Sequence, residues 1–417
     1  MIVTRLKLAN LRAIEAAEFR FQPGINLIVG VNGVGKTSVL DALAVCLSAV
    51  TKRVNKLRSR VETFPVDDIR VGAGALTVEC NVQIGGRDYT YLLHKPRETS
   101  VPQEKKAGMP RQQTQDTPER AKFIGEAPSP VFGSEPGGRP LAVLFSTNRA
   151  APSERLPGKA VTTGDMEAAF ADAFARRELR LGDFAAWMKV QESLRSERPA
   201  SGRVLDACQA AVKRFLPGYS NLRLDGEDNL RLFIDRAAMP IPVRQLSDGE
   251  RGMLALVLDL TRRLAQANPG LTDPAAESEA VVLIDEIELH LHPKWQRQIV
   301  HNLVEAFPRC QFIATTHSPQ VIGEVEQQRI QIIADDLVYS PTHSYGVDSS
   351  RVLEEVMDSY SRTKNVQELL TKISKEIDQQ QFDQARALLD EIAKQLGEND
   401  PEVTRIRTLL NFMEGDE

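Results

Sequence analysis

Eight consecutive residues near the N-terminus have the types and spacing needed to bind a chain of phosphates. The segment GVNGVGKT, residues 30–37, fits the pattern G-x-x-x-x-G-K-[ST]. Its glycines let successive backbone N–H groups converge on an anion, and a following helix presents its N-terminus to negative charge. Lys36 would reach the β- and γ-phosphates, and the Thr37 hydroxyl would bind Mg²⁺. An apolar run precedes the segment and a stretch of helical composition follows it, which is the context this chemistry requires.

A pair of adjacent acids ends a second apolar run late in the chain. Residues 280–284 are apolar, and Asp285 and Glu286 follow them directly. A strand ending in this way would place Asp285 beside the Mg²⁺ and Glu286 within reach of a water molecule. Glu286 could then orient and deprotonate the attacking water. Many strands end in acids, so this pattern becomes specific only together with the phosphate-binding loop.

A third short segment could bind an anion through a helix N-terminus. In Leu246-Ser247-Asp248-Gly249-Glu250, a serine and a glycine precede a helix expected to begin near Glu250. The Ser247 hydroxyl and the first backbone N–H groups of the helix would form the site. Taken alone, the segment is better explained as an ordinary helix N-cap.

The elements that must position these residues alternate between strands and helices. The late succession of strand 280–284, helix 293–305 and strand 311–314 predicts a parallel or mixed sheet with helices on its faces, and so an α/β fold. Alternating and apolar runs predict the other regular elements: strands 2–8, 19–21, 25–29, 141–145 and 230–235, a hairpin over 76–93 that turns at Gly85-Gly86, and helices 36–50 and 254–264.

Composition divides the chain into a head, a linker and a tail. Residues 95–140 are rich in Pro, Gln, Ser and Thr without an apolar period, which predicts a flexible linker between head segments 1–94 and 141–345. The apolar residues within 165–216 predict a helical insert that could form a short arm. Within 346–417, helical periodicity predicts a hairpin, with Gly397 as a C-cap and Pro401 opening a third helix.

Overall composition excludes several classes of protein. The 417 residues, with 42% hydrophobic residues and a net charge of −5, are typical of a folded chain rather than a disordered one. The four cysteines lie far apart, which favours reduced thiols in a cytoplasmic protein. No hydrophobic stretch of signal-peptide length precedes a small-residue cleavage site near the N-terminus. The longest weakly polar run, Ala42–Val50, is far too short to span a membrane, so no membrane partner is expected.

The net charge conceals an asymmetry between the two ends. Residues 1–60 hold ten Lys and Arg against three Asp and Glu, a balance of +7, whereas residues 351–417 hold nine against fifteen, a balance of −6. The patch Lys52–Arg60 contains five cations in nine residues. Such a patch could bind nucleic acid, although it is more often only a solvated face.

Taken in this order, the motifs resemble the heads of ABC-type ATPases, in the branch that contains RecF, SMC and the OLD nucleases. The approach to the phosphate loop, FQPGINLIVG over residues 21–30, is similar to that branch. So is ANLR over residues 9–12, where Leu11 departs from the family but Arg12 matches. His317, in Thr-Thr-His-Ser-Pro, resembles the family's switch histidine. The likeness covers residues 1–94 and 141–340, and no counterpart of the glutamine loop is evident.

The resemblance implies a P-loop ATPase head with a mixed sheet, a short helical insert and a helical tail, and it implies ATP and Mg²⁺ as cofactors. It assigns catalysis to Lys36, Glu286 and His317 and metal binding to Thr37 and Asp285. The residues that it assigns to nucleotide binding are Arg12, Asn32, Gly33, Gly35, Lys36, Thr37, Ser38, Ser247, Gly249 and Glu250.

The family mechanism also implies a homodimer or a higher homo-oligomer. Ser247 and Gly249 of one head would act on the γ-phosphate bound to the other head, so that two heads enclose two ATP molecules. Asp285 and Glu286 would act on the nucleotide of their own head.

Two other sequence features have competing explanations. His290 and His292 form an H-x-H pair beside Glu288, but no local spacing supplies further metal ligands. The segment instead resembles the loop that lines the dimer interface of OLD-like ATPases, with Pro293 opening the next helix. Asp335-Asp336 superficially resembles the paired acids of a nuclease domain. We interpret this pair as a strand-end turn and predict no nuclease activity in the chain.

The sequence most resembles the ATPase subunits of Septu-type and related retron-associated antiphage systems. This resemblance rests on the run IDEIELHLHPKWQ, the passage Ser344-Tyr345-Gly346 and the helical tail. In such systems the ATPase associates with a separate HNH endonuclease. The first hypothesis is therefore a defence ATPase that controls such a nuclease through residues 346–417. The alternative is a RecF-like DNA-repair ATPase that binds duplex DNA through the patch Lys52–Arg60. A membrane-transporter subunit is a distant third.

Overall fold

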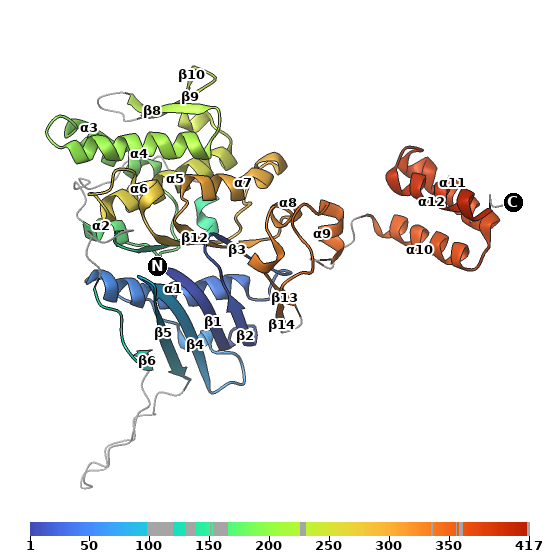
Figure 1. The fold of residues 1–417 in the computed structure, drawn as a ribbon, viewed down its shortest axis with the longest axis horizontal. Coiled ribbons are helices and arrows are strands. Elements are labelled where there is room, and N and C mark those ends of the chain that lie inside the picture. The colour runs from blue at the N-terminus through green and yellow to red at the C-terminus, as the bar shows by residue number, and fades with distance from the viewer. Residues whose placement is uncertain are drawn as a thin grey trace, which may run out of the picture. The chain divides into compact units, whose positions relative to one another are not determined.

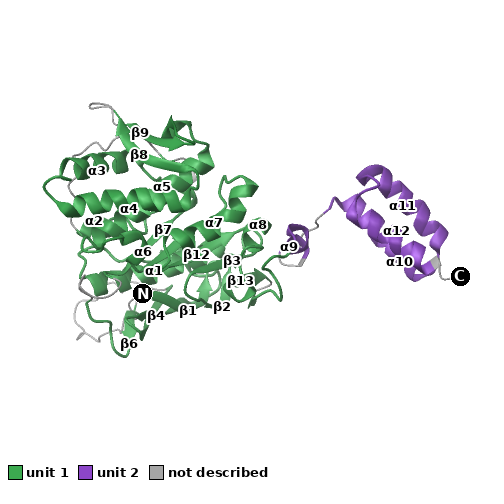
Figure 2. Ribbon diagram, turned by 45° about the horizontal axis from the view of Figure 1, so that its top comes forward, with its two compact units in different colours: residues 1–347 green, residues 348–417 purple. Residues whose placement is uncertain are grey.

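The structure is a computed structural model that describes residues 1–97, 120–130, 138–150, 152, 166–225, 231–334, 337–355, 357 and 362–414. Within it the chain forms two compact units, Met1–Val347 and Asp348–Glu417 (Figure 2). None of the described helices is both long and apolar enough to cross a bilayer. Asp335-Asp336, interpreted above as a turn, lies outside the described residues.

A six-stranded mixed sheet forms the centre of the larger unit, in the order β14-β13-β3-β12-β11-β7. Five strands run parallel and β14 pairs antiparallel with β13. Four of the strands are completely buried runs, which is typical of parallel strands covered on both faces. The predicted mixed sheet is confirmed, with strands β3 (Ile25–Val29), β7 (Leu141–Phe145), β11 (Ala280–Ile284), β12 (Cys310–Thr316), β13 (Ile330–Ala334) and β14 (Leu337–Tyr339).

An antiparallel five-stranded sheet, in the order β2-β1-β4-β5-β6, lies on the other side of helix α1 (Lys36–Asn55) (Figure 1). Apolar side chains of α1 and of both sheets form one core cluster between them. The predicted hairpin over 76–93 is confirmed by the pairing of β5 with β4, and the strand near residues 19–21 pairs with the first strand as β2 with β1. The strands are β1 (Ile2–Leu11), β2 (Ile14–Arg20), β4 (Ala75–Ile84), β5 (Arg87–Pro96) and β6 (Arg120–Ile124).

The prediction of a flexible linker over 95–140 is wrong at β6. This strand pairs with Thr90–His94 of β5, and the rings of Phe123 and Tyr91 meet edge to face at 5.3 Å. The local composition is polar because β6 is an exposed edge strand. The strand forms because the edge of β5 is available for pairing. The sequence of residues 95–140 alone does not show that this edge lies beside it.

The predicted helical insert is confirmed as helices, but it does not form an arm. Helices α2 (Met166–Phe170), α3 (Leu181–Ser193) and α4 (Pro199–Phe215) pack with α5 (Asp248–Ala267). Trp187 and Phe215 of the insert are buried. The apolar side chains of the insert are therefore buried within the larger unit, and the insert does not project as a separate arm. A three-stranded antiparallel sheet follows the insert: β8 (Tyr219–Asp225), β9 (Arg231–Arg236) and β10 (Met239–Pro242).

Three further helices complete the larger unit: α6 (Pro274–Glu277), α7 (Pro293–Ala306) and α8 (Pro319–Ile322). The predicted helix beginning at Pro293 is therefore confirmed. His292 caps it, because the His292 Nδ1 atom accepts a hydrogen bond from the backbone N–H of Lys294 at 3.3 Å.

The described residues of the smaller unit, Asp348–Glu417, form helices and the turns between them. Helix α9 (Ser349–Glu355) precedes α10 (Lys364–Asp378), α11 (Phe382–Leu396) and α12 (Pro401–Glu414). The last three share a core that includes Ile373, Leu389 and Leu410. The predicted hairpin and third helix are confirmed, including Gly397 after α11 with φ of 94° and Pro401 as the first residue of α12.

Candidate active site

Residues from three separate motifs meet at one edge of the central sheet. Strands β7, β11, β12 and β3 are neighbours and run parallel, so their carboxyl ends lie together. Ser146, Asp285, His317 and Gly30 each come directly after one of these strands. The carboxyl end of a parallel sheet is the usual ligand-binding edge in α/β proteins. The fold therefore gathers the predicted phosphate loop, acid pair and histidine.

The phosphate-binding loop wraps around its own lysine. The Lys36 ammonium donates hydrogen bonds to the carbonyl oxygens of Gly30 at 2.8 Å and Val31 at 2.9 Å. Lys36 is buried, and this burial lowers its pKa against the opposing attraction of Asp285. Asn32 and Gly33 are exposed at the mouth of the loop. At Gly30, φ is 156° and a Cβ atom would lie 2.6 Å from the backbone oxygen of Ile333, so only glycine fits.

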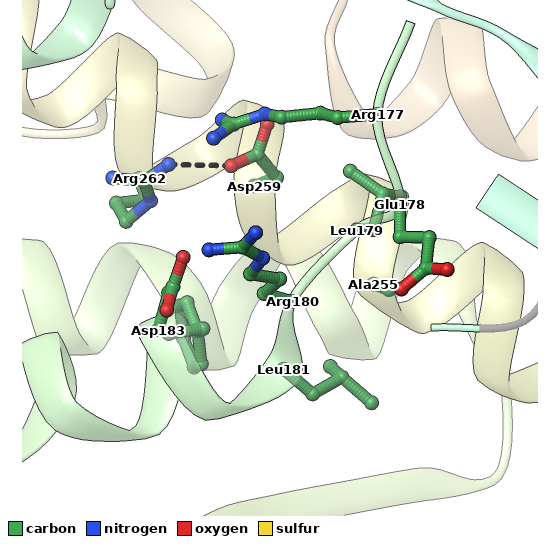
Figure 3. Close-up of a pocket in the computed structure, with 10 residues that line it drawn as sticks. Arg177, Glu178, Leu179, Arg180, Leu181, Asp183, Ala255, Asp259 and Arg262 are labelled. Atoms are coloured by element: carbon green, nitrogen blue, oxygen red, sulfur yellow. Dashed lines mark hydrogen bonds and ion pairs between the residues drawn. The ribbon is translucent and has the colours of Figure 1, made fainter. Parts of the chain in front are cut away.

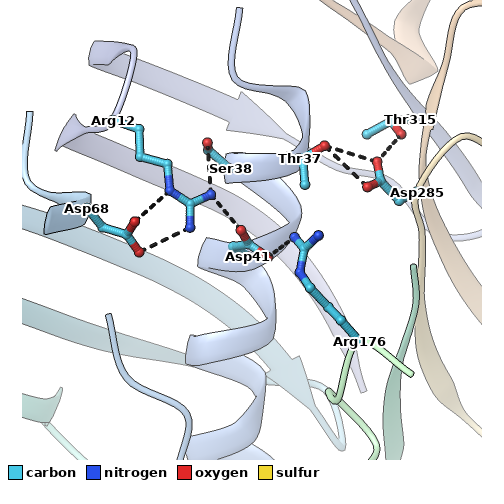
Figure 4. A network of polar contacts seen from close by, with 8 residues as sticks. All are labelled: Arg12, Thr37, Ser38, Asp41, Asp68, Arg176, Asp285 and Thr315. Atoms are coloured by element: carbon cyan, nitrogen blue, oxygen red, sulfur yellow. Dashed lines mark hydrogen bonds and ion pairs between the residues drawn. The ribbon is translucent and has the colours of Figure 1, made fainter. Parts of the chain in front are cut away.

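Oxygen ligands suited to Mg²⁺ lie beside the loop. The Thr37 hydroxyl is 3.2 and 3.3 Å from the two carboxylate oxygens of Asp285 (Figure 4). Thr315 donates a hydrogen bond from its hydroxyl to Asp285 Oδ1 at 2.7 Å and so holds the carboxylate in place. One carboxylate and one hydroxyl beside a phosphate loop match the way Mg²⁺ binds with substrate phosphates. The donor set therefore fits the ion that the sequence implies.

Glu286 occupies a strained position. Its φ is 50°, in the left-handed region that non-glycine residues seldom adopt. The backbone N–H of Glu286 donates to the Thr315 hydroxyl at 2.7 Å, which helps to hold this conformation. Strained residues tend to cluster at functional sites, because the surrounding structure must over-determine them. The side chain is only half buried, so it is open to a water molecule.

His317 is held next to the lysine and the acids. Its backbone N–H donates to Glu288 Oε1 at 2.5 Å, and Glu288 Oε2 is buried with no hydrogen-bond partner among the described residues. Burial, followed by the charge of Lys36, lowers the pKa of the His317 imidazole. This shift favours the neutral imidazole, which has one nitrogen able to donate a hydrogen bond and one able to accept.

Arg12 is fixed by carboxylates. Its guanidinium bonds both oxygens of Asp68 at 2.8 and 3.1 Å and Asp41 at 2.6 Å, and it donates to the Ser38 hydroxyl at 3.3 Å (Figure 4). Arg176 pairs with the same Asp41. This network ties the first hairpin to the beginning of α1. Contact of Arg12 and Ser38 with a nucleotide stays a prediction.

The segment Ser247–Glu250 forms a complete capping box at the start of α5. Ser247 Oγ accepts from the Glu250 N–H at 3.3 Å and donates to Glu250 Oε2 at 2.8 Å. Tyr219 of β8 donates its hydroxyl to Glu250 Oε1 at 2.7 Å, and its pKa is raised to about 12 by burial and by this bond. Although burial alone would raise it, the bonds from Tyr219 and Ser247 lower the pKa of Glu250. The helix N-cap that we gave above as the other explanation of this segment is therefore present. It leaves the N-terminus of α5 partly exposed.

Gly249 lies against the loop that follows the acid pair. A Cβ atom at Gly249 would be 2.5 Å from the backbone oxygen of His290, whereas one at Gly252 would lie 3.6 Å from that of Arg149. We therefore expect Gly249→Ala to lower the free energy of unfolding by about 1–3 kcal/mol through overpacking. Gly252→Ala is the matched control and should be neutral or stabilising, because alanine favours a helix interior. Urea denaturation measures both, and equal stability of the two variants would contradict the proposed contact.

The H-x-H pair does not form a metal site with other described residues. His292 acts as the cap of α7, and His290 is exposed with φ of 59°. Across the described ranges, no group of three or more His, Cys, Asp or Glu side chains is placed to hold a metal ion.

Sequence reasoning missed three residues at this site. Thr315 and the buried Arg149 both bind the turn at Asp285–Glu286, and Glu288 binds the backbone of His317. Thr315 lies in the quoted Thr-Thr-His-Ser-Pro segment, so its place at a strand end was a usable signal. Arg149 lies in the 3₁₀ turn Thr147–Ala150 after β7 and had no such signal.

A cavity elsewhere in the unit is too small for a nucleotide. It lies between α3 and α5 and has a volume of about 20 Å³ (Figure 3). Arg177, Arg180, Asp259 and Arg262 line it, and the Arg262–Asp259 ion pair is 2.5 Å long. A space of this size holds about one water molecule. The cluster is therefore structural.

The known proteins that this chain resembles include ATPases. Residues 5–124 match a family described as an AAA domain, and residues 158–323 match one described as "AAA domain, putative AbiEii toxin, Type IV TA system". The chain is 39% identical over 174 residues to the Retron Ec83 probable ATPase of Escherichia coli, covering 42% of this chain and 32% of that protein. This chain thus spans about a third of the length of that relative.

Two further matches extend over most of the chain. The Septu protein PtuA of Bacillus thuringiensis is 22% identical over 399 residues, which are 91% of this chain and 90% of that protein. The structure of an SMC head bound to the C-winged helix domain of ScpA has a TM-score of 0.48 and 15% identity, covering 82% of this chain and 97% of that one. Together, the motifs, their meeting at one sheet edge and the sequence matches show that the chain is similar to ABC-type P-loop ATPases and to the Septu protein PtuA.

Proposed function

We propose that this protein binds Mg²⁺–ATP at the edge of the central sheet and hydrolyses it. The observation that supports this most is the meeting of Lys36, Thr37, Asp285, Glu286 and His317 at the ends of adjacent parallel strands. These five residues come from three separate segments of the sequence, which the fold brings to one edge of the sheet.

The residues divide the chemistry among them. Lys36 and the loop N–H groups bind the β- and γ-phosphates. Thr37 and Asp285 would hold a Mg²⁺ ion, whose charge would offset that of the phosphates. Glu286 orients a water molecule in line with the γ-phosphate and accepts its proton. The neutral His317 donates a hydrogen bond to the γ-phosphate, where negative charge increases in the transition state.

The proposal includes a dimer in which each head completes the site of the other. Ser247 is exposed at the start of α5 and Gly249 is buried in its first turn; the Ser247 hydroxyl and the first N–H groups of the helix would form the anion site. To bind the γ-phosphate of a second head, Ser247 would exchange its bond to Glu250 for one to the phosphate. Tyr219 would then keep Glu250 in place.

We further propose that the protein serves in antiphage defence and controls a separate HNH-type nuclease through the unit Asp348–Glu417. The relationship to PtuA and to a retron ATPase supports the defence role. On α12 the large apolar side chains Leu409, Phe412 and Met413 are 37%, 69% and 44% exposed. Exposed apolar groups that lie close together are typical of a protein-binding surface.

Removal of residues 348–417 tests the partner-binding role. If an HNH protein is encoded beside this chain, we expect the full chain to co-purify with it and the fragment 1–347 to lose it while still binding ATP. The full chain with Leu409→Glu and Phe412→Glu should lose the partner as well, because these changes charge the exposed face without removing the core. An unchanged complex would contradict the assignment. ATP-dependent duplex binding that weakens steeply with salt would instead favour the RecF-like alternative.

A further inference from the structure

A buried arginine that belongs to none of the sequence motifs bonds the backbone of both acids. Arg149 is 3% exposed, and it donates to the carbonyl oxygens of Ser146 at 3.0 Å, Asp285 at 2.5 Å and Glu286 at 2.6 Å. Among the described residues it forms no ion pair with a carboxylate. Burial lowers its pKa to about 10, against the attraction of Asp285, Glu288 and Glu286. A buried cation is costly unless hydrogen bonds compensate it, and here carbonyl groups provide them.

The bonds from Arg149 fall on the strained turn at Glu286, where φ is 50°. The turn has one hydrogen bond of its own, from the Leu289 N–H to the Glu286 carbonyl oxygen at 2.9 Å, and side chains bind it on both peptide groups of Glu286. The Thr315 hydroxyl accepts a hydrogen bond from the Glu286 N–H. The Arg149 guanidinium donates a hydrogen bond to the Glu286 carbonyl oxygen. Because the guanidinium is planar and rigid, two of its nitrogens fix two successive carbonyl groups at once. That geometry determines the directions in which the Asp285 and Glu286 side chains leave the backbone.

We propose that Arg149 is a positioning residue for ATP hydrolysis. It holds the Asp285–Glu286 turn so that the Glu286 carboxylate meets the attacking water and the Asp285 carboxylate stays beside Thr37. Arg149 itself touches neither nucleotide nor metal. The inference rests on the proposed function, since it assigns the arginine to the same reaction.

A matched control exists on α5. Arg263 is 1% exposed, donates to the carbonyl oxygens of Ala169 at 2.7 Å and Ala171 at 3.0 Å, and pairs with Asp259. It is therefore another buried arginine bound to backbone carbonyls. Among the described residues, its hydrogen bonds and ion pair are made to Ala169, Ala171 and Asp259 and not to the acid pair, so its replacement reports the general effect of losing a buried arginine.

The test compares R149M, R149K and R263M in the full chain. The measurements are kcat and KM for ATP, the Mg²⁺ concentration that half-saturates binding of a fluorescent ATP analogue, and Tm. For R149M we expect kcat to fall about 100-fold, because small misplacement of a reacting group has effects of this size, with KM little changed. The half-saturating Mg²⁺ concentration should rise about 10-fold, as for other residues that orient a metal ligand. R149K should restore part of both losses, and R263M should lower Tm without either kinetic change.

Several results would overturn the assignment. One is a kcat for R149M that falls no further than that of R263M; another is a Mg²⁺ requirement equal to that of the wild type. If R149M does not fold, R149K decides the matter, because it keeps the charge but supplies one ammonium in place of the fork. An R149K variant with wild-type kcat and Mg²⁺ requirement would refute the role. If the wild type binds ATP without hydrolysing it, the proposed function fails, but the Mg²⁺ titration still tests Arg149.

Discussion

Replacement of Glu286 by glutamine is expected to reduce ATP hydrolysis by about 10²–10⁴-fold while leaving ATP binding intact. This range is what a positioned general base contributes to a reaction. Glutamine has the same shape as glutamate, so the left-handed turn at residue 286 and its bonds to Thr315 and Arg149, which involve only the backbone, are preserved. The amide can no longer accept the proton of the attacking water.

The same variant tests the proposed dimer. If two heads enclose two ATP molecules, blocking hydrolysis should trap them together, and size-exclusion chromatography of E286Q with Mg²⁺–ATP should show a dimer that ADP does not produce. Glu305→Gln is the matched control, because Glu305 is an exposed glutamate on α7 with 56% side-chain exposure. It should behave as the wild type. A strictly monomeric E286Q protein that still hydrolyses ATP would exclude both the dimer and the role of Glu286.

Replacement of Lys36 by methionine is expected to weaken ATP binding about 100-fold and to abolish turnover. A charge-assisted hydrogen bond contributes about 1.5–3 kcal/mol, and the upper value corresponds to a factor of about 100 in Kd. In the structure the Lys36 ammonium already lies inside the loop, bonded to two carbonyl oxygens, so it is placed to bind phosphate with little reorganisation. Methionine fills a similar volume without the charge.

Isothermal titration calorimetry with Mg²⁺–ATP measures this effect directly. Lys52→Met is the matched control, because Lys52 lies on the same helix, α1, near its C-terminal end and away from the phosphate loop. It should bind ATP as the wild type does. A K36M variant that retains wild-type affinity would show that the nucleotide is held elsewhere.

Regular elements with a strong local pattern could be predicted from the sequence. Buried strands such as Ile25–Val29 and Ala280–Ile284 are continuous apolar runs, and the tail helices repeat apolar residues at helical spacing. Strand β6 could not be predicted, because its polar residues follow from an edge position that only its partner β5 defines. The helices of the insert were predicted, but their packing on α5 was not, since amphipathic periodicity does not identify the partner surface.

By itself, the sequence determined the chemistry of this protein. The phosphate loop, the acid pair and the segment Ser247–Glu250 each consist of residues that are adjacent in the chain. Their residue types and the elements beside them therefore indicate what they can bind. Only the tertiary structure decided how these units are held. Arg149 reaches the carbonyls of Asp285 and Glu286 because β7 and β11 are neighbours in the sheet, although more than a hundred residues separate them in the chain. Sheet order depends on the packing of the whole unit, and no local pattern of residues encodes it.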